Sequence, residues 1–377
     1  MLSLVSIGNL IFSMVKSSID KKEKLSHISR IVNSMKVDVE QLREFSYTDY
    51  GYVSEELRRQ AWPKLLGLQL DCKAPTYGKI WLEKHRDYTQ VVLDVNRSLK
   101  RFPSAMKEEH RSKLQEQLTT LIMKVLVSNP QLHYYQGFHD ICVTFLLTLG
   151  KDLGYAAVDS ISRSHLRDFM DVDMNRTRSM LNYLYPILER ADPEVKAYME
   201  KAEVGTIFSL SWLITWYSHV LDDAKHTVRL YDFFLASHPL MPIYLAVAVV
   251  VYRREEVLKT EPEMCFIHVL LSKMPTDLPC EQLINTARTL FALWPPYLLA
   301  SEANFEYNHS KTIKNFLKFE RAIGIKTKEE SLTSAKVNDA DRDDRMSYAS
   351  TNLYKVTMWT ITAAVGVAVV ALQYVVS

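Results

Sequence analysis

Residues 111–137 read RSKLQEQLTTLIMKVLVSNPQLHYYQG, and this stretch decides the fold class. Its aliphatic side chains recur at the spacing of one helix face, at Leu114, Leu118, Leu121, Ile122 and Val125. Asn129-Pro130 then ends the predicted helix, because proline lacks the N–H and clashes with the preceding turn. The pattern predicts a helix from Arg111 to Ser128, followed by a short loop that leads into an apolar helix over 141–149.

The same periodicity returns along the chain. Leu181, Leu184, Tyr185 and Leu188 form a second stripe, which predicts a helix in the middle of the domain. The short apolar run from Ile243 to Tyr252 has the length of a buried core helix. We therefore predict an all-α fold.

Composition excludes several classes of function. The chain has 10 glycines in 377 residues, well below the ~7 % of ordinary globular chains, which disfavours glycine-rich nucleotide-binding loops. The Gly78-Lys79 pair lacks the glycine that a P-loop needs at position 73, where Lys73 stands. Forty-six basic against 44 acidic residues give no nucleic-acid footprint. The four cysteines show no Cys-x-x-Cys pairing, so neither a metal site nor a disulfide framework is indicated; Cys142, inside an apolar run, is expected in the core.

Two short motifs carry the chemistry. Val91-x-x-Asp94-x-x-Arg97 is followed about 40 residues later by Asn-Pro and then Tyr134-x-Gln136. An isolated Asp-x-x-Arg on a helix is usually a solvated ion pair. In this order and spacing, however, the two motifs resemble the catalytic signatures of the TBC domain, the family of GTPase-activating proteins for Rab GTPases.

Three further stretches strengthen the resemblance. Leu57 to Gly67 is similar to the entry of a TBC domain, and we expect Trp62 in the core and Arg58 in a structural ion pair. Ser211 to Tyr217 resembles the family's tryptophan-rich helix, and Val228 to Leu235 resembles the block that follows it. Aromatic residues at this density are expected in the core.

The resemblance implies a division of roles. Arg97 would neutralise charge on the transferring phosphoryl group, and Gln136 would orient the attacking water in place of the Rab's own glutamine. Asp94 would orient Arg97, and Tyr134 would brace the Gln136 loop. The chain would need no cofactor or metal of its own, because GTP and Mg²⁺ would be bound by the partner, a Rab GTPase of the early secretory pathway.

One departure from the family leaves an alternative for the arginine. The usual Thr-x-Pro after Asp-x-x-Arg is replaced by a longer spacing, with Arg101 one helical turn beyond Arg97 and nearer to Pro103. The spacing from Asp94 favours Arg97, and the distance to the proline favours Arg101. The subfamily that is anchored in membranes by a C-terminal segment has this same longer spacing.

The chain divides into four predicted parts. Residues 1–50 form an N-terminal helical extension, 51–300 the TBC domain, 301–355 a helix and a disordered tether, and 356–377 a transmembrane tail anchor. The last 22 residues carry no charged side chain and as a helix would span about 33 Å, enough for a ~30 Å hydrocarbon core. The tether, with one predicted amphipathic helix over 311–323, is otherwise rich in charged and small polar residues.

The predicted anchor also indicates in which membrane the protein resides. By resemblance, the membrane is that of the endoplasmic reticulum with the domain facing the cytosol, and the mitochondrial outer membrane is the alternative. Met1 to Val15 is also apolar and uncharged, but it is short and lacks a preceding basic region; read as a secretory signal, it would place the chain in the lumen instead. The competing function is a non-catalytic TBC-like scaffold that binds Rab or membrane proteins.

Overall fold

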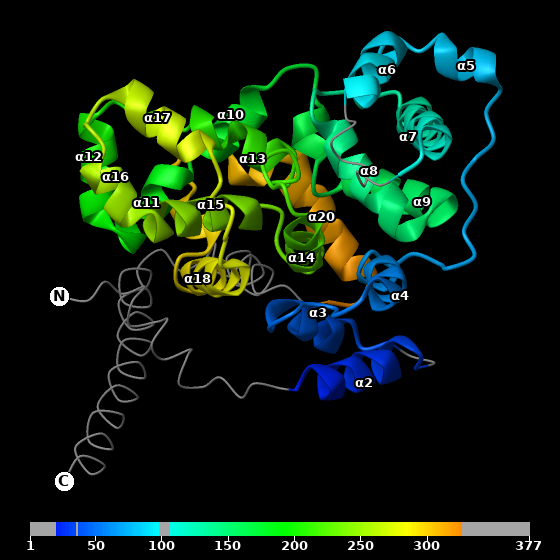
Figure 1. The fold of residues 1–377 in the computed structure, drawn as a ribbon, viewed down its shortest axis with the longest axis horizontal. Helices are drawn as coiled ribbons and strands as arrows, with labels where there is room; N and C mark the ends of the chain where they lie inside the picture. The colour runs from blue at the N-terminus through cyan, green and yellow to red at the C-terminus, as the bar shows by residue number, and fades with distance from the viewer. Residues whose placement is uncertain (1–19, 35–36, 98–105, 326–377) are drawn as a thin grey trace, which may run out of the picture. The chain divides into compact units, whose positions relative to one another are not determined.

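The computed structural model describes residues 20–34, 37–97 and 106–325, and within them every regular element is a helix (Figure 1). The predicted all-α fold class is confirmed. The described residues as far as Ile323 belong to one compact unit.

The unit begins with three helices that pack on one another. These are α2 (Lys21–Val32), α3 (Val39–Tyr47) and α4 (Glu55–Leu65). Lys24 of α2 is buried, and its ammonium donates to the backbone oxygens of Phe45 and Asp49 at 2.9 and 2.6 Å. The described part of the predicted N-terminal extension thus contains two helices, and the hydrogen bonds of Lys24 connect α2 to the end of α3.

The next group of helices holds one wall of the pocket described below. Its members are α5 (Lys79–Glu83), α6 (Tyr88–Arg97), α7 (Glu108–Ser128), α8 (Phe138–Leu149) and α9 (Lys151–Arg163). The predicted stripe of α7 packs against α6, α8 and α9, and the helix ends at Ser128 as expected. Helix α8 is buried over nearly its whole length, Cys142 included, as predicted.

The second half of the unit surrounds α15, whose residues 241–250 are all buried. Helix α15 packs against α11 and α18, as Figure 1 shows. The elements are η2 (Arg167–Met170), α10 (Asn175–Leu181), α11 (Leu184–Ala191), α12 (Pro193–Lys201), η3 (Ile207–Ser209), α13 (Leu210–Ile214), α14 (Ala224–Leu235), α15 (Met241–Tyr252), α16 (Arg254–Lys259), α17 (Met264–Ser272), α18 (Cys280–Leu293), α19 (Pro296–Leu299), η4 (Tyr307–His309) and α20 (Lys311–Ala322), where η marks a 3-10 helix.

The stripe from Leu181 to Leu188 does not lie on one helix, so this prediction was wrong. The chain breaks after Leu181 and restarts at Leu184, giving α10 and α11. Pro186 explains the break, because it has no N–H to donate to the carbonyl of Asn182 four residues earlier.

The tryptophan-rich segment is also shorter as a helix than expected. Helix α13 ends at Ile214, and Trp216 takes a left-handed φ of 47°. The amide of Trp216 donates to Leu213 and that of Tyr217 to Trp212, which is the Schellman pattern of a helix end. Both Trp216 and Tyr217 are buried, so the expected core role of these aromatic residues is confirmed.

A buried carboxylate joins the first and second halves of the unit. Asp232 of α14 is fully buried and accepts from Arg58 Nη2 at 2.8 Å and from Trp62 Nε1 at 2.7 Å. The backbone amide of Tyr52 donates to the same carboxylate at 3.1 Å. The predicted structural ion pair of Arg58 and the core position of Trp62 are thus confirmed.

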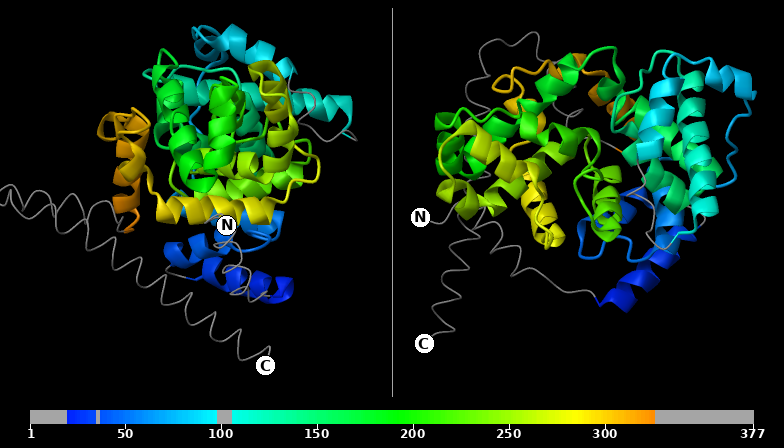
Figure 2. Two further views of the ribbon diagram at one scale, coloured as in Figure 1. Left: turned by 90° about the vertical axis from the view of Figure 1, so that its left-hand side faces the viewer. Right: turned by 45° about the horizontal axis from the view of Figure 1, so that its top comes forward.

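Helix α20 belongs to the same compact unit and lies along one edge of it (Figure 2). Its N-terminus is capped by Ser310, whose hydroxyl accepts from the amide of Ile313 at 3.1 Å. The buried carboxylate of Asp168 accepts from the Ser310 hydroxyl and from the amide of Lys311, at 2.5 and 3.0 Å.

Several predictions fall on residues that the structure does not describe. Arg101, the segment Met1 to Val15, the tether after 325 and the proposed anchor over 356–377 lie outside the described residues. Within the described part of the chain, no helix has both the length and the apolar character that crossing a membrane requires.

Candidate functional site

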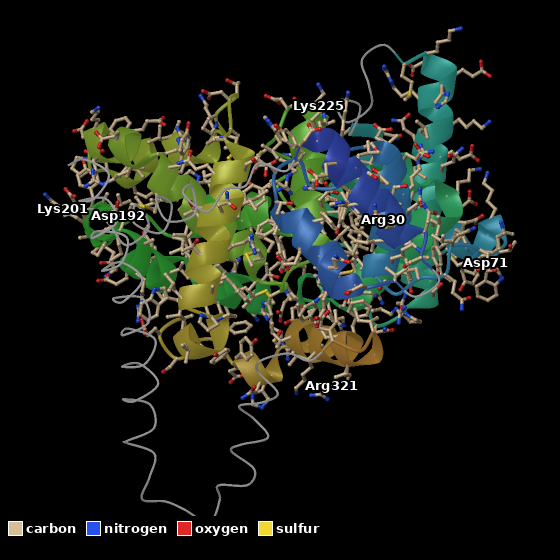
Figure 3. All side chains as sticks on the ribbon, turned by 90° about the horizontal axis from the view of Figure 1, so that it is seen from below. Arg30, Asp71, Asp192, Lys201, Lys225 and Arg321 are labelled. Carbon is tan, nitrogen blue, oxygen red and sulfur yellow. The ribbon has the colours of Figure 1, made fainter. Side chains whose placement is uncertain are left out.

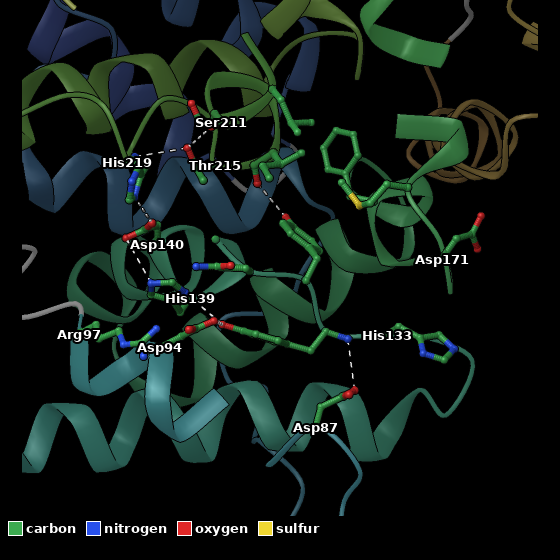
Figure 4. Close-up of a pocket in the computed structure, with 18 of the residues that line it drawn as sticks. Asp87, Asp94, Arg97, His133, His139, Asp140, Asp171, Ser211, Thr215 and His219 are labelled. Atoms are coloured by element: carbon green, nitrogen blue, oxygen red, sulfur yellow. Dashed lines mark hydrogen bonds and ion pairs between the residues drawn. The ribbon is translucent and has the colours of Figure 1, made fainter. Parts of the chain in front are cut away.

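All four predicted site residues line one pocket of about 880 Å³. Arg97 and Asp94 come from α6, and Tyr134 and Gln136 come from the turn between α7 and α8. The opposite wall is the segment 210–222, which carries Ser211, Thr215 and His219 (Figure 4).

Arg97 is the last residue of α6, and its side chain is exposed. No hydrogen bond or ion pair of this guanidinium is found among residues 20–34, 37–97 and 106–325. The guanidinium therefore places a fixed positive charge in the pocket wall, and no carboxylate among the described residues pairs with it.

Gln136 is exposed at the tip of a turn whose neighbours are buried. Gly137 follows it with φ of 107°, and a Cβ on this glycine would lie 2.8 Å from the methyl group of Thr215. A glycine is therefore required here for two reasons, its backbone conformation and the close approach of the opposite wall. The predicted loop between two packed helices is present.

The two supporting residues are bonded to each other. The hydroxyl of Tyr134 donates to Asp94 Oδ2 at 2.9 Å, and Gln90 Nε2 donates to Asp94 Oδ1 at 2.9 Å. Burial, together with the nearby charge of Asp94, raises the pKa of Tyr134 well above its usual value, so its hydroxyl stays protonated and can donate. These bonds connect α6 to the Gln136 turn. The orientation of Arg97 by Asp94 stays a prediction.

A chain of polar groups continues from Tyr134 across the floor of the pocket (Figure 4). His139 Nδ1 lies 3.0 Å from the Tyr134 hydroxyl, whose only proton is given to Asp94, so His139 must donate. Asp140 Oδ2 lies 2.9 Å from His219 Nδ1 on the opposite wall. The pair joins the start of α8 to the segment before α14.

Two further bonds fix the turn itself. The amide of Tyr134 donates to Asp87 Oδ2 at 3.3 Å, just before α6. The hydroxyl of Tyr135 donates to the carbonyl of Ile214 at 2.9 Å. The Gln136 turn is therefore held from both walls, and its exposed carboxamide has a defined starting position.

Asp87 and His219 were not predicted as site residues, because no sequence pattern selects either of them. His139 and Asp140 had a weak signal, since they are polar residues at the start of an otherwise apolar helix directly after Tyr-x-Gln. His219 stands in no motif, and only its distance from Asp140 reveals it. Among the described residues, no group of three or more His, Cys, Asp or Glu side chains is arranged to hold a metal ion.

Comparison with known proteins gives a consistent result. Residues 55–258 match the Rab-GTPase-TBC domain. TBC1 domain family member 20 of Bos taurus is 50% identical over 298 residues, which cover 79% of this chain and 74% of that protein. The Homo sapiens protein of the same name is 45% identical over 93% of this chain and 89% of its own length.

A more distant relative and a solved structure extend the comparison. The GTPase-activating protein gyp10 of Schizosaccharomyces pombe is 32% identical over 72% of this chain and 74% of its own. The crystal structure of the Ypt/Rab-GAP domain of Gyp1p superposes with a TM-score of 0.62 at 14% identity, covering 74% of this chain and 100% of that one. At this identity the structural likeness shows the shared fold.

Proposed function

Because this chain belongs to the Rab-GTPase-TBC domain family, as its motifs predicted, we propose that it stimulates GTP hydrolysis by a membrane-bound Rab GTPase. The observation that carries the proposal is the pocket in which Arg97 and Gln136 are both exposed. They come from separate elements, and neither side chain has a hydrogen-bond partner among the described residues.

Arg97 acts as an arginine finger in this proposal. A planar guanidinium stabilises the charge that spreads over the oxygens of the transferring phosphoryl group, and such a residue is worth roughly 10³–10⁵ in rate. Its exposed position at the end of α6 supports this role. Asp94, which accepts a direct hydrogen bond from Tyr134 of the turn, keeps the end of α6 in register with Gln136.

Gln136 orients the attacking water. A carboxamide both donates and accepts, so it can hold a water against a phosphoryl group. The bonds of Tyr134 and Tyr135 to opposite walls support this role, because they fix the turn that presents the carboxamide. GTP and Mg²⁺ are brought by the partner, and this chain supplies side chains only.

We further propose that the chain is a tail-anchored protein of the endoplasmic reticulum membrane that acts in early secretory traffic. The uncharged stretch 356–377 supports the anchor, and the motif spacing shared with the membrane-anchored subfamily supports the location. Removal of residues 356–377 should release the protein to the cytosol and leave hydrolysis of a soluble Rab unchanged. An integral membrane protein after this deletion would instead implicate residues 1–15.

The arginine is tested with single substitutions against a panel of Rab GTPases. Arg97→Ala and Arg97→Lys should both lose most of the stimulated hydrolysis, since an ammonium lacks the planar fork. Arg30→Ala is the matched control, because Arg30 is also exposed in the last turn of a helix. If Arg101→Ala is the inactive variant and Arg97→Ala retains activity, Arg101 is the finger.

The glutamine is tested by exchanging carboxamides between the two proteins. Gln136→Ala should bind the Rab but fail to stimulate it, whereas Gln131→Ala, exposed in the same loop, should be normal. A Rab whose own switch glutamine is replaced by alanine should still respond to the wild-type chain. Full activity of Gln136→Ala would leave Arg97 as the sole finger. A wild-type chain that binds Rab GTPases but stimulates hydrolysis by none of them would favour a non-catalytic scaffold.

A further inference from the structure

Helix α20 is mounted rigidly on the compact unit. Asp168 receives hydrogen bonds from its first turn, and Phe316 in its middle is buried. Near its end, Glu320 accepts from both terminal nitrogens of Arg43 at 2.6 Å each. Whatever the outer face of α20 binds is therefore held in a fixed orientation to the domain.

The outer face of α20 is basic. Lys314, Lys318 and Arg321 follow one another at i, i+4 and i+7 and are exposed, and Figure 3 shows Arg321 at the edge of the domain. The helix has one acidic residue, Glu320, and it is turned inward with 2% of its surface exposed. Among the described residues no ion pair joins Lys314 or Lys318 to a carboxylate.

The position of this face in the chain indicates what it binds. Helix α20 is the last element that the structure describes, and the uncharged stretch 356–377 follows about 30 residues after it. If that stretch enters a bilayer, α20 is the folded element nearest to it along the chain. Membranes that contain anionic lipids attract basic side chains, each contributing about a fivefold change in partitioning.

We propose that the basic face of α20 docks on the anionic headgroups of the membrane that holds the anchor. This inference rests on the proposed membrane attachment and is independent of GTPase activation. Lys311, in the first turn of α20, contacts Asp171 of the pocket rim at 2.7 Å. Docking therefore fixes the direction in which the pocket faces a partner on the same membrane.

The experiment uses the full chain with vesicles of phosphatidylcholine, alone or with about a third of phosphatidylserine. Flotation is measured first, and exposed lysines are then acetylated and quantified by mass spectrometry. On anionic vesicles, the reactivity of Lys314 and Lys318 should fall about fivefold relative to neutral vesicles. Lys201 and Lys225, exposed elsewhere on the domain, should be unchanged (Figure 3).

Salt and a matched pair of variants give the controls. High salt should restore the reactivity, since attraction to headgroups is screened within about a Debye length. Lys318→Gln should weaken the protection of Lys314, and Lys225→Gln should leave it intact. Equal reactivity of Lys314 and Lys318 on both kinds of vesicle overturns the docking proposal.

Flotation separates the failure of docking from the failure of the anchor. A chain that floats with both kinds of vesicle has the anchor, and its lysine reactivity then decides whether α20 docks. A chain that floats only with anionic vesicles, with Lys314 and Lys318 protected, lacks the anchor but docks through α20. A chain that floats with neither overturns both proposals.

Discussion

Replacing Tyr134 by phenylalanine tests how the Gln136 turn is supported. The change removes one hydroxyl and keeps the ring, which packs against Phe138 with centroids 6.3 Å apart. Asp94, only 2% exposed, then loses the donor at 2.9 Å and keeps Gln90. Because a hydrogen bond to a charged group contributes about 1.5–3 kcal/mol, we expect the free energy of unfolding to fall by that amount.

The assay is thermal and urea denaturation, paired with stimulated GTP hydrolysis. At roughly 2 °C per kcal/mol for a unit of this size, the Tm should fall by about 3–6 °C. Tyr77→Phe is the control, because its hydroxyl lies 3.0 Å from the neutral Ser128 hydroxyl and its loss costs only about 0.5–1.5 kcal/mol. Hydrolysis should fall with Tyr134→Phe but not with Tyr77→Phe, since of these two hydroxyls only that of Tyr134 connects the Gln136 turn to α6.

A Tyr134→Phe protein no less stable than Tyr77→Phe would contradict this prediction. Full stimulation of hydrolysis by a Tyr134→Phe protein that had lost the expected stability would contradict it as well. The first result would mean that the bond to Asp94 contributes little net energy. The second would mean that the turn keeps its geometry without it.

Three other predictions concern the core and the turn. Asp232→Ala should lower the free energy of unfolding by about 3–5 kcal/mol in urea denaturation, because it leaves the buried Arg58 unpaired, and adding Arg58→Met should recover part of the loss. Burial lowers the pKa of His165 and of His238 from 6.5 to about 3, so below pH 6.5 only the unfolded chain takes up these protons. The contribution of the two histidines to stability should therefore fall on acidification by about 1.4 kcal/mol per pH unit and per histidine, and be constant above pH 7; an unchanged slope below pH 6.5 in His165→Gln would contradict this. Gly137→Ala should cost about 1–3 kcal/mol, seen as a lower Tm, because φ is 107° there, and a neutral effect would show that the turn can relax.

Local patterns predicted the helices and the exposed turn, because both depend on residues close in sequence. The stripe of α7 and its stop before Pro130 required nothing beyond periodicity and the chemistry of proline. The break before Pro186 follows from the same rule, although the aliphatic spacing continues across it. The left-handed turn at Trp216 had no such signal, since tryptophan rarely adopts that conformation.

Local sequence patterns could not predict which residues distant in sequence form hydrogen bonds with one another. Arg58 was expected to pair, but its partner Asp232 is 174 residues away. Asp94 and Tyr134 were both assigned to the site from their motifs, yet their direct bond across 40 residues follows only from the packing of α6 against the turn. His219 illustrates the limit, because its contact with Asp140 spans 79 residues and involves no motif.

The bond between Arg43 and Glu320 has a consequence for synthesis of the protein. The two residues are 277 positions apart, and at ~5–20 residues per second the ribosome needs roughly 15–55 s to pass from one to the other. During that interval α3 has emerged without the helix that covers its arginine. We therefore expect the nascent chain to stay incompletely folded, and open to chaperones, until α20 leaves the exit tunnel. A chain cut at residue 258, where the family match ends, would remain at that stage.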